Sequence, residues 1–256
     1  MCGFDIDGTI RNPGGIPKEM KRGLHVVGKA EIKKVAVTGR GWPAVPEKLA
    51  GGFTDDEIFT APHVCENGGR IAIGDNNLHF EALEKEAVEE VVNLWDQGGL
   101  DVVKFFPEDP SAEIISVDRN ETDLSACQLH TSLNEAGPSM VYAHPVEPHV
   151  NLFPGEINAT PVDGGTWYHV NPQGVNKRNG LLRVADMFGL DPSNVAVFGN
   201  DHNDRDMLVA DKFGLRGFVG TPQHFAELEL PSDVLRIENV RTLGLLLQAG
   251  LHNLAA

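Results

Sequence analysis

Two aspartates stand one residue apart near the start of the chain, at the end of the apolar run in MCGFDIDGTI. Side chains at positions i and i+2 of a strand point to the same side, so Asp5 and Asp7 would present two carboxylates together. Gly8 permits a close backbone approach, and the amide groups that follow can surround an anion. Paired carboxylates in this setting indicate chemistry on a charged substrate or at a metal ion.

Two further predicted strands also end in polar residues. Thr38 and Arg40 end the run VAVTGR, and Lys177 stands at the start of a predicted helix in GVNKRNGLL. The strand NVAVFG is followed by four amides and carboxylates: Asn200, Asp201, Asn203 and Asp204. Because the ligand crevice of an open α/β sheet lies beyond the carboxyl ends of its strands, we expect these groups to meet at one edge. Clustered carboxylates suit a hard cation such as Mg²⁺ and would repel one another without it.

The elements that must position these residues alternate between strand and helix in the first and last thirds of the chain, which is typical of a parallel α/β sheet. The middle differs, because the strands LDVVKFF and AEIISVDR follow each other closely between helical stretches. We therefore predict the α/β class, with a Rossmann-like parallel-sheet core in residues 1–69 and 172–256 and an inserted α+β domain in residues 70–171. A short helix is predicted in WPAVPEKLA.

Composition narrows the classes of partner. The 256 residues carry a formal net charge of −16, which disfavours binding to nucleic acid or to an anionic membrane surface. The three cysteines have no disulfide or zinc spacing, no apolar run is long enough to span a bilayer, and the first residues lack a signal-peptide pattern. We expect a cytoplasmic protein, monomeric or homodimeric, that acts on a small molecule.

In this order, these motifs resemble those of the haloacid dehalogenase superfamily, in its Cof-like branch of phosphatases. The family motif DxDGT is matched by Asp5, Asp7, Gly8 and Thr9, its strand-terminal hydroxyl by Thr38, and its lysine by Lys177. GNDHND corresponds to the fourth motif, and the ENGG that contains Asn67 resembles the passage from core to cap. The resemblance implies that residues 70–171 form a cap of the family's larger type, C2 or IIB.

The resemblance also implies a role for each site residue. Asp5 would attack phosphorus and form an aspartyl-phosphate, Asp7 would act as general acid and base, and Lys177 would neutralise the phosphate. Phosphate or substrate contacts would come from Gly8, Thr38, Gly39, Arg40, Asn67 and Asn203. Mg²⁺ would be held by Asp5, Asp7, Asn200 or Asp201, and Asp204. The implied activity is Mg²⁺-dependent hydrolysis of a small phosphomonoester, such as a sugar phosphate or a similar phosphorylated metabolite.

One position departs from the family pattern. The fourth motif normally begins with an acidic metal ligand, and this chain has Asn200 there with Asp201 directly after it. The sequence leaves open which of the two ligates the metal.

Other functions remain as alternatives. A phosphomutase or phosphotransferase of the same superfamily would use the same residues, and a non-catalytic sugar-phosphate binder would account for Asn200. GRGWPA matches a dinucleotide-binding pattern, but Pro43 removes a backbone donor where a pyrophosphate would sit. In the inserted domain we expect Trp167 and Tyr168 to be packing residues.

The inserted domain also holds several histidines. We keep His144, His149 and His169 only as candidate functional residues of the cap. None of these residues identifies the substrate.

Overall fold

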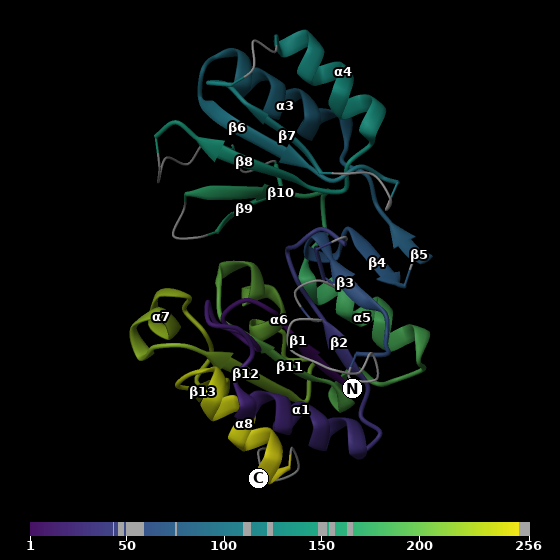
Figure 1. Cartoon of the computed structure of the whole chain (residues 1–256), viewed down its shortest axis with the longest axis vertical. Coiled ribbons are helices and arrows are strands. Elements are labelled where there is room, and N and C mark those ends of the chain that lie inside the picture. Colours follow the sequence, from purple (N-terminus) through teal and green to yellow (C-terminus); the bar gives the residue numbers. More distant parts are fainter. Residues whose placement is uncertain are drawn as a thin grey trace.

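The computed structural model describes residues 1–42, 44–45, 49, 59–74, 76–109, 114–121, 125–147, 153, 157–162 and 166–250. The chain forms two lobes, one above the other (Figure 1). The lower lobe contains both the first and the last helices, whereas the upper lobe is built from the middle of the chain.

A five-stranded parallel sheet forms the centre of the lower lobe. Its strands, in spatial order, are β13 (Leu235–Ile237), β12 (Leu215–Val219), β11 (Ala196–Gly199), β1 (Cys2–Phe4) and β2 (Lys34–Ala36). The first strand is central, with Cys2 opposite Ala196 on one side and Lys34 on the other. The predicted parallel core is confirmed.

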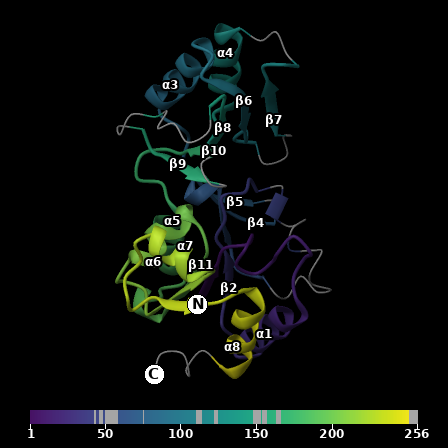
Figure 2. The ribbon, with the colours of Figure 1, turned by 90° about the vertical axis from the view of Figure 1, so that its left-hand side faces the viewer.

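Helices cover both faces of this sheet. One face carries α1 (Lys18–Lys29) and α8 (Val240–Ala249), which pack side by side (Figures 1 and 2). The other face carries α5 (Lys177–Met187) and α6 (Arg205–Val209). The short helix α7 (Pro222–Glu227) follows β12. Apolar residues alternate along the strands to serve both faces, so Ala36 joins one core cluster while Val35 and Val37 join the other.

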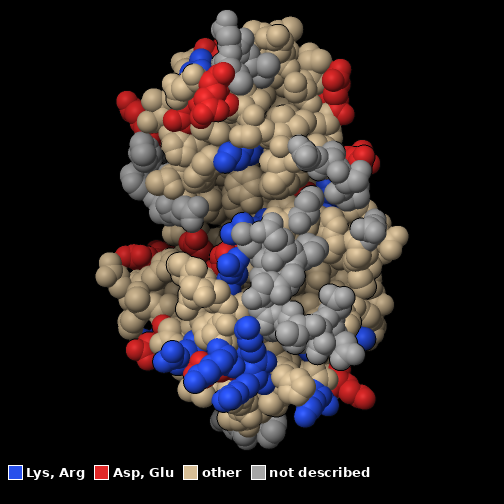
Figure 3. Space-filling model, viewed as in Figure 1, with Lys and Arg blue, Asp and Glu red and all other residues tan. Residues whose placement is uncertain are grey.

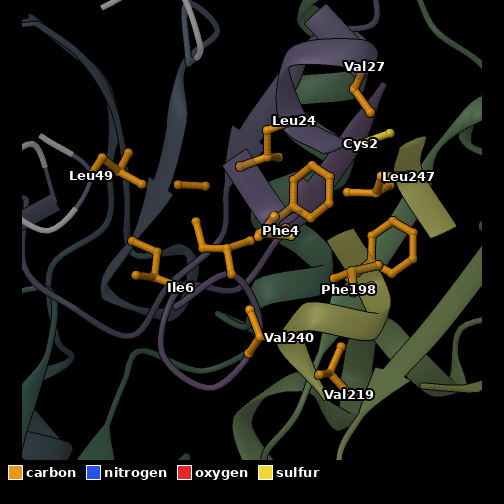
Figure 4. Close-up of a cluster of buried hydrophobic side chains, with 14 of the residues drawn as sticks. Cys2, Phe4, Ile6, Leu24, Val27, Leu49, Phe198, Val219, Val240 and Leu247 are labelled. Carbon is orange, nitrogen blue, oxygen red and sulfur yellow. The ribbon is translucent and has the colours of Figure 1, made fainter. Parts of the chain in front are cut away.

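The first strand is fixed by its burial. Phe4 is fully buried, and its ring stacks on that of Phe198 with 5.2 Å between centroids. Figure 4 shows these two rings among Leu24 of α1 and Leu247 of α8. Burying a phenylalanine side chain stabilises a fold by about 1.5–3 kcal/mol, so this packing holds the three-residue strand in place. Asp5 follows directly and is thereby anchored.

The upper lobe is a five-stranded antiparallel sheet with two helices on one face. Its strands, in spatial order, are β7 (Ile115–Asp118), β6 (Leu100–Phe105), β8 (Val141–Pro145), β10 (Trp167–Val170) and β9 (Ala159–Val162). The helices α3 (Lys85–Asp96) and α4 (Ala126–Ala136) lie on the face turned away from the lower lobe (Figures 1 and 2). The predicted class, a parallel α/β core with an α+β cap, is confirmed.

A small third sheet was not predicted. In chain order it lies between the strand β2 of the core and the helix α3 of the cap. It consists of β3 (His63–Cys65), β4 (Arg70–Ile73) and β5 (Asn76–Phe80). Between β3 and β4, the single turn η2 (Glu66–Gly68) places the fully buried Glu66 carboxylate 3.0 Å from Arg70 Nε. Arg70 also donates to the backbone oxygens of Pro107 and Glu108, which ties this sheet to the cap.

The cap limits at residues 70 and 171 stay a prediction. Gly68 and Gly69, expected at the first junction, lie within and directly after η2. We also predict a glycine junction at residues 164–165, near the second limit; it and most of the helix expected in WPAVPEKLA lie outside the described residues. No helix in the described part of the chain combines the length and apolarity needed to cross a bilayer.

Candidate active site

Asp5, Lys177 and Asp204 meet beyond the carboxyl end of β1. Lys177 Nζ lies 2.7 Å from Asp5 Oδ1 and 2.6 Å from Asp204 Oδ1. Lys177 begins α5, as predicted, with Asn176 as the N-cap residue. Lys177 and Asp204 have no exposed surface and Asp5 is 6 % exposed. The structure therefore brings together three of the residues that the sequence singled out.

Burial sets the electrostatics of this group. Desolvation raises the pKa of Asp5 to about 7, against the opposing effect of the Lys177 ammonium. Burial alone would lower the pKa of Lys177, but the carboxylates of Asp204 and Asp5 outweigh burial and raise it. Lys177 therefore stays charged at neutral pH, and additional positive charge beside Asp5 would favour its carboxylate form.

Asp204 also shapes the loop after β11. Its Oδ2 accepts the backbone N–H groups of Asn200 and Asp201, at 2.8 and 3.1 Å. Both oxygens of this carboxylate are thus engaged with the protein, one with the loop and one with Lys177. Its predicted role at the metal stays a prediction.

The side-chain amide of Asn200 lies at the other side of Asp5. The outer amide atom of Asn200 lies 2.7 Å from the Asp7 backbone oxygen and 3.1 Å from Asp5 Oδ2. With Nδ2 there, Asn200 donates to both. With Oδ1 there, three oxygens face one another and Oδ1 accepts a 2.9 Å hydrogen bond from Thr9. Oxygens around octahedral Mg²⁺ lie about 3 Å apart, so the second arrangement fits a magnesium ion.

Gly8 is needed for this approach. Its φ is +83°, and a Cβ on it would lie 2.4 Å from Asn200 Nδ2, so another residue would be strained and would collide with the amide. The Gly8 N–H donates to the Arg11 carbonyl at 2.8 Å. A local turn therefore uses the Gly8 N–H in this structure, and its contact with a phosphate stays a prediction.

Asp7 is paired with Arg40 at the mouth of the site. Arg40 Nε donates to Asp7 Oδ2 at 2.5 Å, and both side chains are partly exposed. Asp7, which accepts this bond, raises the pKa of Arg40 above its ordinary value. The predicted contact of Arg40 with substrate stays a prediction, and in this structure Arg40 pairs with Asp7.

The turn after β2 offers donors for an anion. Thr38 is buried, and its hydroxyl accepts the Arg40 N–H at 3.1 Å. The Gly39 N–H has no acceptor among the residues that the structure describes. Asn67 and Asn203 are hydrogen-bonded to each other beside this turn, with Asn203 Nδ2 donating to Asn67 Oδ1 at 3.2 Å.

The Asp201 side chain is partly exposed. Its Oδ1 accepts the His202 N–H at 2.7 Å and lies 3.9 Å from His224 Nε2. Asp201 also lines the cavity described next. Whether it or Asn200 ligates a metal stays a prediction.

A cavity of about 610 Å³ lies between the lobes and joins these residues to the cap. Asp5, Asp7 and Thr38 line its lower wall, and Lys104, Tyr142 and His169 line its upper wall. Figure 3 shows a hollow between the lobes, with Lys or Arg atoms on both sides of it.

The cap residues in this wall were only partly foreseen. His169 was a candidate, but Lys104 and Tyr142 were not identified. Trp167 packs edge-on against Tyr142 and His144, as expected, and also lines the cavity, whereas Tyr168 is buried in the cap core as predicted. The alternation of polar and apolar residues in these strands was the available signal.

A parallel core and an antiparallel cap thus enclose a cavity, and Asp5, paired with the buried Lys177, lines that cavity. The sequence profile of the haloacid dehalogenase-like hydrolases matches residues 3–127 and 149–215. The chain belongs to this family, and the predicted family is confirmed.

Several relatives align with most of the chain. A phosphoglycolate phosphatase of Natronomonas pharaonis is 38 % identical over 207 residues, which are 80 % of this chain and 78 % of that protein. Another, of Methanococcoides burtonii, is 26 % identical over 217 residues, 83 % of this chain and 80 % of that protein. A solved HAD subclass IIB sugar phosphatase has a TM-score of 0.78, with 16 % identity over 100 % of this chain and 99 % of that chain. The predicted enzyme class, a phosphatase with a Cof-like cap, is thereby confirmed.

The position of Asn200 leads to a prediction about metal affinity. Asn200→Asp places a carboxylate oxygen beside Asp5 Oδ2 and the Asp7 carbonyl and should lower the Mg²⁺ concentration for half-maximal activity by about tenfold. Asp201→Asn should raise this concentration slightly and leave the turnover at saturating Mg²⁺ largely intact. Calorimetric titration with Mg²⁺ measures the same affinities without turnover. A silent Asn200→Ala together with loss of metal binding in Asp201→Ala would make Asp201 the ligand.

Proposed function

We propose that this protein hydrolyses small phosphomonoesters through a phosphoryl group carried on Asp5, with Mg²⁺ as cofactor. The observation that carries this proposal is the placement of Asp5, whose two oxygens face different partners. Oδ1 faces the buried Lys177 ammonium, and Oδ2 lies 3.1 Å from the outer amide atom of Asn200, which is itself 2.7 Å from the Asp7 carbonyl. A carboxylate held from both sides is prepared for in-line attack on phosphorus.

The proposed reaction has two steps. In the first, a carboxylate oxygen of Asp5 bonds to phosphorus, the ester bond to the leaving oxygen breaks, and Asp7 gives that oxygen a proton. In the second, Asp7 takes a proton from water, whose oxygen attacks phosphorus, and the acyl-phosphate bond breaks to release phosphate and the Asp5 carboxylate. Arg40, paired with Asp7, keeps Asp7 at the cavity mouth, where the leaving group would lie.

Positive charge and donors would hold the phosphoryl oxygens. Lys177 supplies a fixed ammonium, and Thr38 and the Gly39 N–H supply donors at the adjacent turn. Mg²⁺, held by Asp5, the Asp7 carbonyl and Asn200, would neutralise charge on the transferring group. Asp204 positions Lys177 and the loop that contains Asn200.

The class of substrate is proposed from the relatives. Several are named phosphoglycolate phosphatases, and one is named 5-amino-6-(5-phospho-D-ribitylamino)uracil phosphatase. These names favour a small phosphorylated metabolite, such as phosphoglycolate or a sugar phosphate.

Metal removal tests the proposed activity. Purified protein should release phosphate from an aryl phosphate in the presence of Mg²⁺, and excess EDTA should stop the release because the oxygens around Asp5 Oδ2 then lack a cation. Re-addition of Mg²⁺ should restore the rate, which controls for unfolding. Full turnover in EDTA would contradict the proposed cofactor, and an isomerised product without phosphate would indicate a phosphomutase.

A further inference from the structure

Three side chains form a row across the cap face that looks into the cavity. Lys104 of β6 lies opposite Tyr142 of β8, and Tyr142 lies opposite His169 of β10. Residues directly opposite in antiparallel strands have Cβ atoms about 4.5–5.5 Å apart, so the row spans two strand spacings. All three residues line the cavity that contains Asp5 and Asp7.

The alternate residues of the same strands point the other way. Val103, Val141 and Tyr168 lie in the apolar cluster beneath α3 and α4. Because successive side chains alternate between faces, the row of Lys104, Tyr142 and His169 is fixed on the cavity side. The Tyr142 hydroxyl donates to the Gly39 carbonyl at 2.6 Å, so the row lies directly above the predicted phosphate turn.

A chain of amides fixes the tautomer of His169. Asn171 Nδ2 donates to the backbone oxygens of Glu66 and Ser139, which can only accept, so its Oδ1 must be an acceptor. Asn67 Nδ2 donates to that Oδ1 at 3.0 Å and lies 2.8 Å from His169 Nδ1. His169 Nδ1 therefore accepts, and the ring proton is on Nε2.

The other ring nitrogen is available. His169 is 5 % exposed, and burial, reinforced by the Lys177 charge, lowers its pKa to about 3, so the ring is neutral. Its Nε2 has no hydrogen-bond partner among the described residues. It is also absent from the fully buried side-chain atoms that lack a partner, so it retains some exposed surface. The protein thus holds a neutral N–H donor with an open direction in a cavity wall.

Lys104 adds a charge to the same wall. Its Nζ lies 5.0 Å from the ring centroid of Trp167, a cation–π contact that holds the ammonium beside β10. Within the described part of the chain, no carboxylate lies within 4.0 Å of this ammonium. A lysine with no acidic partner among the described residues is notable in a protein with 37 Asp and Glu against 21 Lys and Arg.

We propose that Lys104 and His169 form a subsite for the carboxylate of a phosphorylated carboxylic acid. Lys104 supplies the charge, and the His169 Nε2–H supplies a directed hydrogen bond. One ammonium and one neutral donor match a monoanionic carboxylate better than a dianionic second phosphate. This inference rests on the proposed function, because the phosphate end of the same molecule would lie at Asp5.

Removing the Lys104 charge tests the subsite. The wild type should prefer 2-phosphoglycolate to 2-hydroxyethyl phosphate, which replaces the carboxylate by a neutral group. Lys104→Met should lower this ratio of kcat/KM values by about 10- to 100-fold, which corresponds to the loss of one hydrogen bond to a charged group. The fall in kcat/KM should be confined to the carboxylated substrate. Lys85→Met is the matched control, because Lys85 is an exposed lysine on α3 that pairs with Glu89.

His169 is tested by the position of its donor. His169→Gln can place an N–H near the former Nε2 and should retain much of the preference, whereas His169→Asn should lose it, with the main change in KM for phosphoglycolate. A long-range proton–nitrogen spectrum of the wild type should show one ring, absent in His169→Gln, with protonated Nε2 and bare Nδ1 across neutral pH.

The outcomes separate this inference from the proposed activity. Equal ratios in the wild type, Lys104→Met and Lys85→Met would overturn the subsite while phosphate release continued. A protonated Nδ1 in the spectrum would overturn the assigned donor, with or without turnover. A lack of phosphate release from every ester would refute the proposed function, and calorimetric titration with phosphoglycolate would still show whether Lys104→Met weakens binding, as the subsite requires.

Discussion

Asp5→Asn should reduce turnover by about 10⁴- to 10⁶-fold, the range seen when an enzyme loses its nucleophile. The substitution preserves the volume of the side chain but removes the charge that attacks phosphorus. Lys177 keeps its other partner, Asp204 at 2.6 Å, so the variant should remain folded. Phosphate release and the thermal midpoint, measured together, check both statements.

Asp186→Asn is the matched control for this loss. Asp186 lies on α5, the helix that begins with Lys177, and it is exposed to solvent. Its substitution should leave turnover unchanged. Near-normal turnover in Asp5→Asn would exclude the proposed nucleophile.

Asp7→Asn should reduce turnover by about 10²- to 10⁴-fold, the usual contribution of general acid–base catalysis. The reduction should depend on the leaving group, because a good leaving group departs without a proton. In single-turnover experiments, phosphorylation by an aryl phosphate should therefore suffer less than phosphorylation by an alkyl phosphate. Equal losses for both esters would count against Asp7 as the acid.

The second step gives an independent check on Asp7. Hydrolysis of the phosphorylated enzyme releases no ester leaving group, so its rate should fall equally whichever substrate delivered the phosphoryl group. The variant should accumulate phosphorylated protein during turnover of an aryl phosphate. A wild-type rate of dephosphorylation in Asp7→Asn would exclude Asp7 as the general base.

The convergence at Asp5 could be predicted because it follows from topology. Parallel strands end at one edge of a sheet, so residues that follow β1, β2 and β11 must lie near one another. The ordered motifs added Lys177, which lies far away in the sequence. The prediction therefore needed only the order of strands and helices and no detail of side-chain packing.

Other features of the site required coordinates. The Gly8 amide is used by Arg11, a local turn contact that the motif does not reveal. The cap row depends on the register between three strands, and a shift by one residue would turn Lys104 away from the cavity. The tautomer of His169 depends on Asn67 and Asn171, which the chain brings together from positions more than 100 residues apart.

Trapping the phosphorylated enzyme tests the central claim most directly. Acid quenching during turnover, followed by borohydride reduction, converts an aspartyl-phosphate to homoserine, and peptide mass spectrometry locates the changed residue. The account predicts homoserine at position 5 of the wild type and none in Asp5→Asn. Homoserine at another aspartate, or active turnover with no reducible acyl-phosphate, would contradict it.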